Sequence, residues 1–146
     1  MTIRTMTVDD YEDVHALLVN TPGMGLNDVD DSREGITRYL SRNPTSCFVA
    51  TDEGHIVGVI LSGHDGRRGY IGHTAVATSA RRRGIGTALV DAALEALRME
   101  GISKVALVVF DRNETGNRFW EHRGFTRRTD LVYRNRALVE LRRFDT

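Results

Sequence analysis

The stretch from Arg81 to Thr87, which reads Arg-Arg-Arg-Gly-Ile-Gly-Thr, has the clearest chemical potential in the sequence. It lies between a predicted strand and a predicted helix, and the first turn of a helix offers unpaired N–H groups and a positive dipole end. Gly84 and Gly86 have no Cβ, so a phosphate could approach their backbone closely. The third glycine of a dinucleotide-binding fold and the Gly-Lys-Ser/Thr of a P-loop are absent. The stretch indicates another kind of pyrophosphate site, although glycine pairs also occur in turns for structural reasons alone.

The charges are unevenly distributed along the chain, although 20 basic residues balance 20 acidic ones. The range 66–90 holds five arginines and no carboxylate, which suggests either a small phosphate-bearing ligand or a solvated basic surface. The range 9–34 holds eight carboxylates and one arginine. We expect this acidic segment to attract a cationic amine, chiefly through Asp28, Asp30 and Asp31, or else to form a solvated face. Neutral net charge argues against a nucleic-acid partner.

Apolar periodicity predicts a single α/β domain over residues 1–146, built on one mixed central sheet. Strands are expected at 3–6, 46–51, 55–62, 70–76, 104–110, 125–128 and 136–141. Helices are expected between Thr7 and Thr21, from Asp31 or Ser32 to Asn43, at about 84–100 and at 113–123. Residues 23–31 are expected to form a loop. The strand at 104–110 is nearly all apolar, which is typical of a central strand covered on both faces.

Two motifs make the chain resemble the GNAT superfamily of N-acetyltransferases. Arg81-x-x-Gly84-x-Gly86, after a strand ending in Ala75-Val76, is similar to the acyl-CoA motif of that family. Asn113-x-x-Gly116-x-x-x-Trp120-x-x-x-Gly124-Phe125 is similar to the family's Asn-x-x-Ala-x-x-x-Tyr-x-x-x-Gly-Phe segment. The resemblance covers essentially the whole chain and is to small bacterial members with no assigned substrate. It implies a GNAT fold, with a mixed central sheet of about six to seven strands, about four flanking helices, and central strands that splay at the cofactor site.

The resemblance also implies an activity and a binding mode. Acetyl would pass from acetyl-CoA to a primary amine of a small molecule or protein by direct attack, without an acyl-enzyme. Backbone groups of residues 74–76 would bind the pantetheine arm, and N–H groups of residues 82–87 would hold the pyrophosphate. The candidate cofactor-binding residues are Thr74, Ala75, Val76, Arg81, Arg82, Arg83, Gly84, Ile85, Gly86, Thr87, Asn113 and Trp120.

Two positions depart from the family pattern. Trp120 stands where the family usually has a Tyr that protonates the leaving thiolate, and an indole N–H cannot serve as that acid. Val108 stands where some members carry a Glu base. His73 and Tyr70, on the strand before the loop, become the candidate catalytic residues, because an imidazole exchanges protons near neutral pH. His73 could equally be a half-buried strand histidine. The alternative function is a catalytically weak acyl-CoA-binding sensor or interaction module.

Other features bound the remaining possibilities. Cys47 is the only cysteine and lies in an apolar run, so we expect a buried thiol and no disulfide. No histidine has the spacing of a metal site, and we expect no metal. No apolar stretch approaches the roughly 18 residues of a membrane span, and the N-terminus lacks a signal-peptide core. We therefore expect a soluble cytoplasmic protein, without a membrane partner, that could form a homodimer as members of the family do.

Overall fold

The structure is built on a mixed sheet of five strands in the order β1-β3-β4-β5-β6. It is a computed structural model that describes residues 1–144. The strands are β1 (Thr2–Thr5), β3 (Phe48–Asp52), β4 (His55–His64), β5 (Gly69–Val76) and β6 (Val105–Ala106). Neighbouring strands are antiparallel except β5 and β6, which are parallel. A separate antiparallel pair consists of β2 (Leu26–Asn27) and β7 (Arg143–Phe144).

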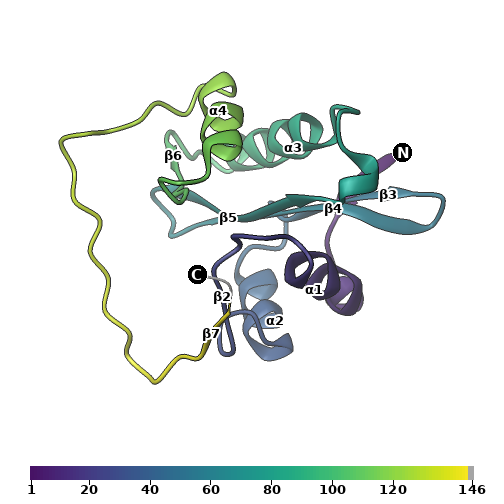
Figure 1. Ribbon diagram of the computed structural model, residues 1–146, viewed down its shortest axis with the longest axis horizontal. Helices are drawn as coiled ribbons and strands as arrows, with labels where there is room; N and C mark the ends of the chain where they lie inside the picture. The colour runs from purple at the N-terminus through teal and green to yellow at the C-terminus, as the bar shows by residue number, and fades with distance from the viewer. Residues whose placement is uncertain (145–146) are drawn as a thin grey trace.

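Helices cover both faces of the main sheet (Figure 1). α1 (Tyr11–Val19) and α2 (Arg33–Arg42) lie on one face, and α3 (Ile85–Met99) and α4 (Glu114–His122) lie on the other. Short 3-10 turns, η1 (Val8–Asp10) and η2 (Thr78–Ala80), come before α1 and before the loop that leads to α3. The α/β class and the four helices confirm the sequence-based expectation. No helix within residues 1–144 combines the length and apolarity needed to cross a membrane.

Alternating side chains divide the interior into two cores, one on each face of the sheet. Val49 and Val59 are buried against α1 and α2, whereas their chain neighbours Ala50 and Ile60 are buried on the face of α3. Leu89 of α3 is fully buried in the second core. Burial of each large apolar side chain contributes about 1.5–3 kcal/mol, so the two cores hold the helices firmly against the strands.

Polar side chains fix the start of each helix on the first face. The Ser32 Oγ accepts a hydrogen bond from the Gly35 N–H at 3.0 Å, which confirms Ser32 as the cap of α2. Asp10 accepts from the Thr7 N–H at 2.9 Å and also binds the Arg4 guanidinium, which lowers the pKa of the Asp10 carboxyl. These contacts fix the chain where it enters α1 and where it enters α2.

The central strands separate as expected. β5 and β6 pair only at Gly69 with Val105 and at Tyr70 with Ala106. β6 then ends, while β5 continues to Val76. Beyond Tyr70, the edge of β5 that faces away from β4 therefore has no partner strand among the described residues. Its backbone groups are open to a ligand at this place.

The C-terminal part of the chain differs from the prediction. The main sheet has five strands rather than six or seven, and the strand expected at 104–110 is limited to β6. The strands expected at 125–128 and 136–141 do not form, and residues 126–142, here called the C-terminal arm, swing away from the sheet (Figure 1). The apolar residues of this arm favour an extended conformation, which is why strands were predicted here. A strand forms, however, only where another strand is available to pair with it. The expected loop at 23–31 contains β2, which pairs with β7 near the end of the chain.

Candidate active site

The loop between β5 and α3 presents a cluster of backbone donors. Arg82 and Gly84 both adopt left-handed conformations, with φ of 64° and 76°. The first hydrogen bond within α3 runs from the Ala88 N–H to the Gly84 carbonyl at 3.0 Å, so the helix leaves the N–H groups of residues 84–87 unused. Curved loops of this kind at the positive end of a helix dipole bind phosphate groups. The predicted pyrophosphate residues are therefore brought together.

The three arginines differ in what they contact. The Arg83 Nη1 lies 3.0 Å from the Asp52 Oδ2, and this hydrogen bond lowers the pKa of the Asp52 carboxyl. The Arg81 Nε donates to the Val76 carbonyl at 3.3 Å. Arg82 is exposed and forms no ion pair with a carboxylate of the described chain. Arg82 thus has its charge available for an anion.

The two glycines of the loop have different roles. A Cβ on Gly84 would meet no atom within 4 Å, so this position is open, and its positive φ favours glycine. A Cβ on Gly86 would lie 3.3 Å from the ring of Phe119, so Gly86 also allows α3 to approach α4. Thr87 contributes to the same contact, because its hydroxyl accepts from the Arg123 Nη1 at 3.0 Å. Ile85 is buried in the second core and anchors the helix start.

The end of β5 offers a polar group without a partner. The Thr74 Oγ1 is buried and has no hydrogen-bond partner among the described residues. Thr74 pairs with Ile60 across β4, and it precedes Ala75 and Val76 at the place where β5 runs free of β6. A buried hydroxyl without a partner costs free energy. This orphan oxygen and the open donors of the loop fit a ligand such as acetyl-CoA.

In this structure Asn113 and Trp120 make contacts that stabilise α4 and its packing. The Asn113 Oδ1 accepts from the Gly116 N–H at 2.9 Å and caps the helix. Trp120 stacks edge-to-face on Phe119 and on Phe125, with ring centroids 5.0 and 5.3 Å apart. Trp120 thereby occupies an aromatic cluster of the second core. Contact of either residue with a cofactor stays a prediction.

A bulge in β5 directs the candidate catalytic side chains. Between the pairs Ile60–Thr74 and Ser62–Ile71, two residues of β5 lie opposite Leu61 alone. This extra residue is a β-bulge, a feature that re-aims side chains beside active sites. Tyr70 lies opposite Gly63, whose Cβ position points at the Asn43 side chain at the end of α2.

His73 points the same way, because its ring meets a carboxylate just before α2. The His73 Nε2 lies 2.7 Å from the Asp31 Oδ1. The bulge therefore places Tyr70 and His73 on the same face, although they are three positions apart on one strand. This pairing was not predicted from the sequence, in which Asp31 was expected to help recognise an amine. No local signal links the two residues, which lie 42 positions apart.

Tyr70 is a half-exposed phenol with suppressed acidity. Burial raises the pKa of Tyr70, and the neighbouring Tyr133 raises it further. Tyr70 is therefore neutral at physiological pH, so it can donate a hydrogen bond but is not a ready base. Val108, past the end of β6, is 58% exposed and offers no group for proton transfer.

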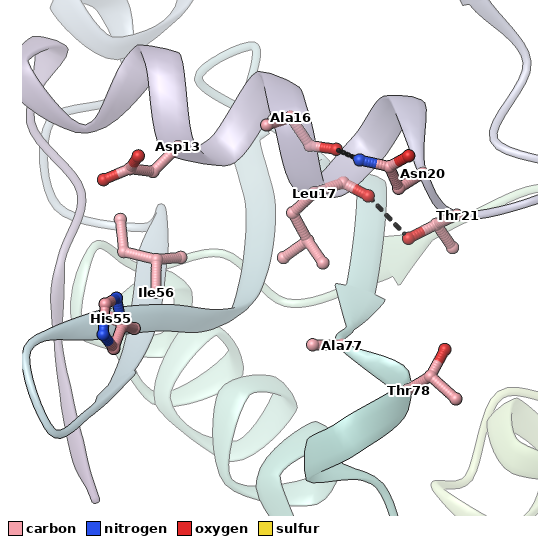
Figure 2. A pocket seen from close by; sticks show the side chains of 9 residues that line it. All are labelled: Asp13, Ala16, Leu17, Asn20, Thr21, His55, Ile56, Ala77 and Thr78. Carbon is pink, nitrogen blue, oxygen red and sulfur yellow. Dashed lines mark hydrogen bonds between the residues drawn. The ribbon is translucent and has the colours of Figure 1, made fainter.

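A cavity of about 360 Å³ lies at the opposite end of β5 from Tyr70, where β4 begins (Figure 2). Its lining comes from α1 and the two residues after it, the start of β4 and the residues after β5, namely Asp13, Ala16, Leu17, Asn20, Thr21, His55, Ile56, Ala77 and Thr78. Asn20 and Thr21 turn their polar atoms back onto carbonyls of α1, as Figure 2 shows. Neither His73 nor the arginine loop lines this cavity. Within residues 1–144, no group of three His, Cys, Asp or Glu side chains could hold a metal ion.

Comparisons with known proteins agree with this geometry. Residues 11–125 match the Acetyltransferase (GNAT) family. An acetyltransferase of Photorhabdus laumondii is 34% identical over 119 residues, which span 78% of each chain. The structure of Ard1 from Thermoplasma volcanium matches with a TM-score of 0.76 and 28% identity, over 86% of this chain and 82% of that one. The PaiA N-acetyltransferase of Thermoplasma acidophilum, solved with coenzyme A, shares the fold with a TM-score of 0.72 at 16% identity, over 84% and 87% of the two chains.

The splayed sheet, its two helical layers and the donor-rich loop are the features of an acyl-CoA-dependent transferase. The chain belongs to the GNAT acetyltransferase family. It is an N-acetyltransferase that moves acetyl from acetyl-CoA to an amine. The alternative of a binding module without catalysis is not favoured, because the matched relatives are acetyltransferases.

Proposed function

We propose that acetyl-CoA lies along the free edge of β5, and that His73 accepts the proton of a primary amine that approaches from the face of α1 and α2. The pyrophosphate is held by the N–H groups of residues 82–87 and by the charge of Arg82. The pantetheine lies beside residues 74–76, where the Thr74 hydroxyl gains a partner. The observation that carries this proposal is the continuity of β5, which runs from His73 directly into the donor-rich loop.

The reaction needs one proton acceptor and correct placement. The His73 imidazole takes a proton from the ammonium form of the acceptor, directly or through water. The neutral amine nitrogen attacks the thioester carbonyl carbon, the C–S bond breaks, and the newly bonded nitrogen gives up a second proton to water to form the amide. The thiolate of coenzyme A leaves and takes a proton from water. Free backbone N–H groups of β5 polarise the carbonyl oxygen. Alignment of amine and thioester supplies about 7–11 kcal/mol, which reduces the need for the missing phenol.

Ligand-dependent melting tests the cofactor part of this proposal. Acetyl-CoA should raise the Tm, because a ligand that binds only the folded state stabilises it. Gly84→Val should abolish this shift, since a side chain there stands among the phosphate donors but meets no protein atom within 4 Å at its Cβ. Gly101→Val, at another glycine with positive φ and open space, controls for backbone strain and should keep the shift. Protection by NAD or ATP but not by acetyl-CoA would contradict the proposal.

The acceptor is a cationic primary amine steered by the acidic segment. Asp28 and Asp30 are exposed on the loop that carries Asp31 to His73, so their charge lies beside the site. Asp31 itself is buried and paired, and it is not free to bind an amine. Asp28→Asn together with Asp30→Asn should raise the KM for the amine and leave that for acetyl-CoA unchanged. Asp91→Asn, exposed on α3, is the control, and an unchanged amine KM in the double variant would refute the steering.

The cytoplasmic location, the homodimer and the absence of a nucleic-acid partner stay predictions from the sequence. Whether the amine belongs to a small molecule or to a protein is decided by a panel that contains both kinds.

A further inference from the structure

We infer that Asp31 is a positioning residue that fixes the ring orientation and the tautomer of His73, an inference that rests on the proposed function. The pair joins the loop before α2 to the bulge of β5, and its heavy atoms are 2.7 Å apart. The Asp31 side chain is 6% exposed and that of His73 is 21% exposed. The carboxylate is thus shielded from water, while the imidazole reaches the surface of the site.

Asp31 is itself held in place by two further contacts. Its second oxygen, Oδ2, accepts from the Asn27 N–H at 2.8 Å. Its backbone carbonyl accepts from the Tyr11 hydroxyl at 2.8 Å, from the buried first turn of α1. Both carboxylate oxygens therefore have fixed donors, and the residue cannot turn away from His73 without losing a bond. A buried carboxylate held this way orients an imidazole as in other enzymes that use a histidine base.

The direction of the hydrogen bond assigns the ring nitrogens. An ionised carboxylate only accepts, so the His73 Nε2 must carry the proton and donate it to Asp31. The Nδ1 is then the nitrogen with the free lone pair. No side chain or backbone group among residues 1–144 bonds to this nitrogen, and it is not among the buried unpaired atoms. The Nδ1 lone pair is therefore unpaired and accessible to solvent, and it is the one available to take a proton from the amine.

The same contact stabilises the protonated ring. When Nδ1 takes a proton, the imidazolium lies 2.7 Å from a buried negative charge. The attraction is strong where water is excluded. Asp31 thus acts twice, since it selects the tautomer before proton transfer and compensates the charge afterwards.

The substitution Asp31→Asn separates positioning from packing. The amide that it introduces has the shape of the carboxylate, but its single oxygen is required by the Asn27 N–H. The NH₂ group of that amide then faces the His73 Nε2 and forces the ring proton onto Nδ1. Asp91→Asn is the control, because Asp91 is an exposed carboxylate of α3, on the opposite face of the sheet from Asp31.

The experiment combines ¹⁵N NMR of the imidazole side chains with steady-state kinetics on the full chain, using acetyl-CoA and a panel of primary amines. His73→Gln assigns the signal among the five histidines. The wild-type protein should show His73 protonated at Nε2, and Asp31→Asn should move the proton to Nδ1. The kcat should fall about 10–100-fold with the KM for acetyl-CoA unchanged, toward the low end of a general-base effect, because the imidazole itself remains. Asp91→Asn should change neither the tautomer nor kcat.

Two results would overturn the inference. One is a wild-type His73 protonated at Nδ1, which needs no variant and so does not depend on the folding of Asp31→Asn. The other is an unchanged kcat in a folded Asp31→Asn protein whose tautomer has switched. If no amine is acetylated by the wild-type chain, the proposed function fails, while the wild-type tautomer still decides whether Asp31 orients His73.

Discussion

Trp120 is the residue at which this chain departs most sharply from its family, and its surroundings explain how it can do so. The indole packs edge-to-face between Phe119 and Phe125. Such contacts depend on the shape of the ring and not on a proton that can be transferred. Trp120 therefore packs within the α4 layer in this structure, and the proposed mechanism gives proton transfer to His73 of β5.

Trp120→Phe should keep most of kcat, because the aromatic packing is largely preserved and no acid is lost. Loss of a true general acid would cost about 10²–10⁴-fold. Release of free thiol from acetyl-CoA in the presence of an amine measures the effect. A variant that binds coenzyme A normally but no longer turns over would make the indole N–H a catalytic contact.

Cys47 gives the chain a defined sensitivity to alkaline pH. Burial raises the pKa of its thiol to about 12, whereas a thiol in an unfolded chain ionises near about pH 8.5. The unfolded state loses its proton first, so the contribution to stability is complete below about pH 8.5 and is lost as pH rises toward 12. The free energy of unfolding should fall by about 2 kcal/mol between pH 8 and 10 through this residue.

Urea unfolding at pH 8 and 10 measures this slope, and Cys47→Ala should flatten it by the stated amount. Tyr39, whose pKa burial also raises, would contribute only at higher pH. Equal slopes in the two proteins would show that the Cys47 thiol is ionised in the folded state, contrary to its burial.

At the scale of elements, the Asn113 cap of α4 depends on the absence of a side chain at Gly116. A Cβ on Gly116 would lie 2.4 Å from the Asn113 Nδ2, so Gly116→Ala must push that side chain out of its capping position. Loss of such a cap costs about 1 kcal/mol. The Tm of the variant should therefore change little, since the intrinsic helix preference of Ala over Gly, about 0.8–1 kcal/mol, offsets that loss. Asn113→Ala in the same background should then add little, and a full further loss would mean that the cap had survived.

The sequence predicted elements well where periodicity and caps coincide. The helices and the β3–β4–β5 meander carry continuous apolar stripes and clear turn residues, so their positions followed from local patterns. The loop before α3 was predicted because arginines and glycines placed together at the start of a helix are typical of a phosphate-binding site. The predictions of strands at 125–128 and 136–141 were wrong, because a strand needs the edge of a neighbouring strand to pair with, and no local sequence pattern specifies that edge.

The candidate site also has one part that local sequence patterns predict and one part that depends on contacts between distant segments. The proposed cofactor half is one continuous segment, from Thr74 to Thr87, so order and spacing along the sequence are enough to predict it. The Asp31–His73 pair joins distant segments, and it depends on a bulge that breaks the two-residue period of β5. Such a contact exists only after the sheet and the α1–α2 segment have packed together.

At the scale of the whole molecule, we predict that the C-terminal arm contacts a second copy of the chain. The arm is held at Phe125 in the second core and at β7 beside β2, so it forms a closed excursion away from its own sheet (Figure 1). Its apolar side chains, among them Leu131, Val132 and Leu138, are exposed, Leu138 at 91%. The outer edge of β6 has no partner among the described strands. We expect the arm of one copy to cover the β6 edge of another.

Light scattering after size exclusion should give a mass near twice the 16.4 kDa of the chain. Leu138→Arg should yield a monomer, because a charge would have to be buried in the interface. Met99→Arg, at an exposed apolar position on α3, is the control and should remain dimeric. A monomeric wild-type protein at micromolar concentration would contradict the predicted dimer.

The central claim is that this chain transfers acetyl to a primary amine with His73 as the proton acceptor. It is tested most directly by amine-dependent release of thiol from acetyl-CoA, measured for the wild-type protein and for His73→Gln. The account predicts release only with primary amines, and a fall of about 10–100-fold in kcat/KM for His73→Gln with acetyl-CoA binding intact. Tight binding of acetyl-CoA without amine-dependent release, or full activity in His73→Gln, would contradict it.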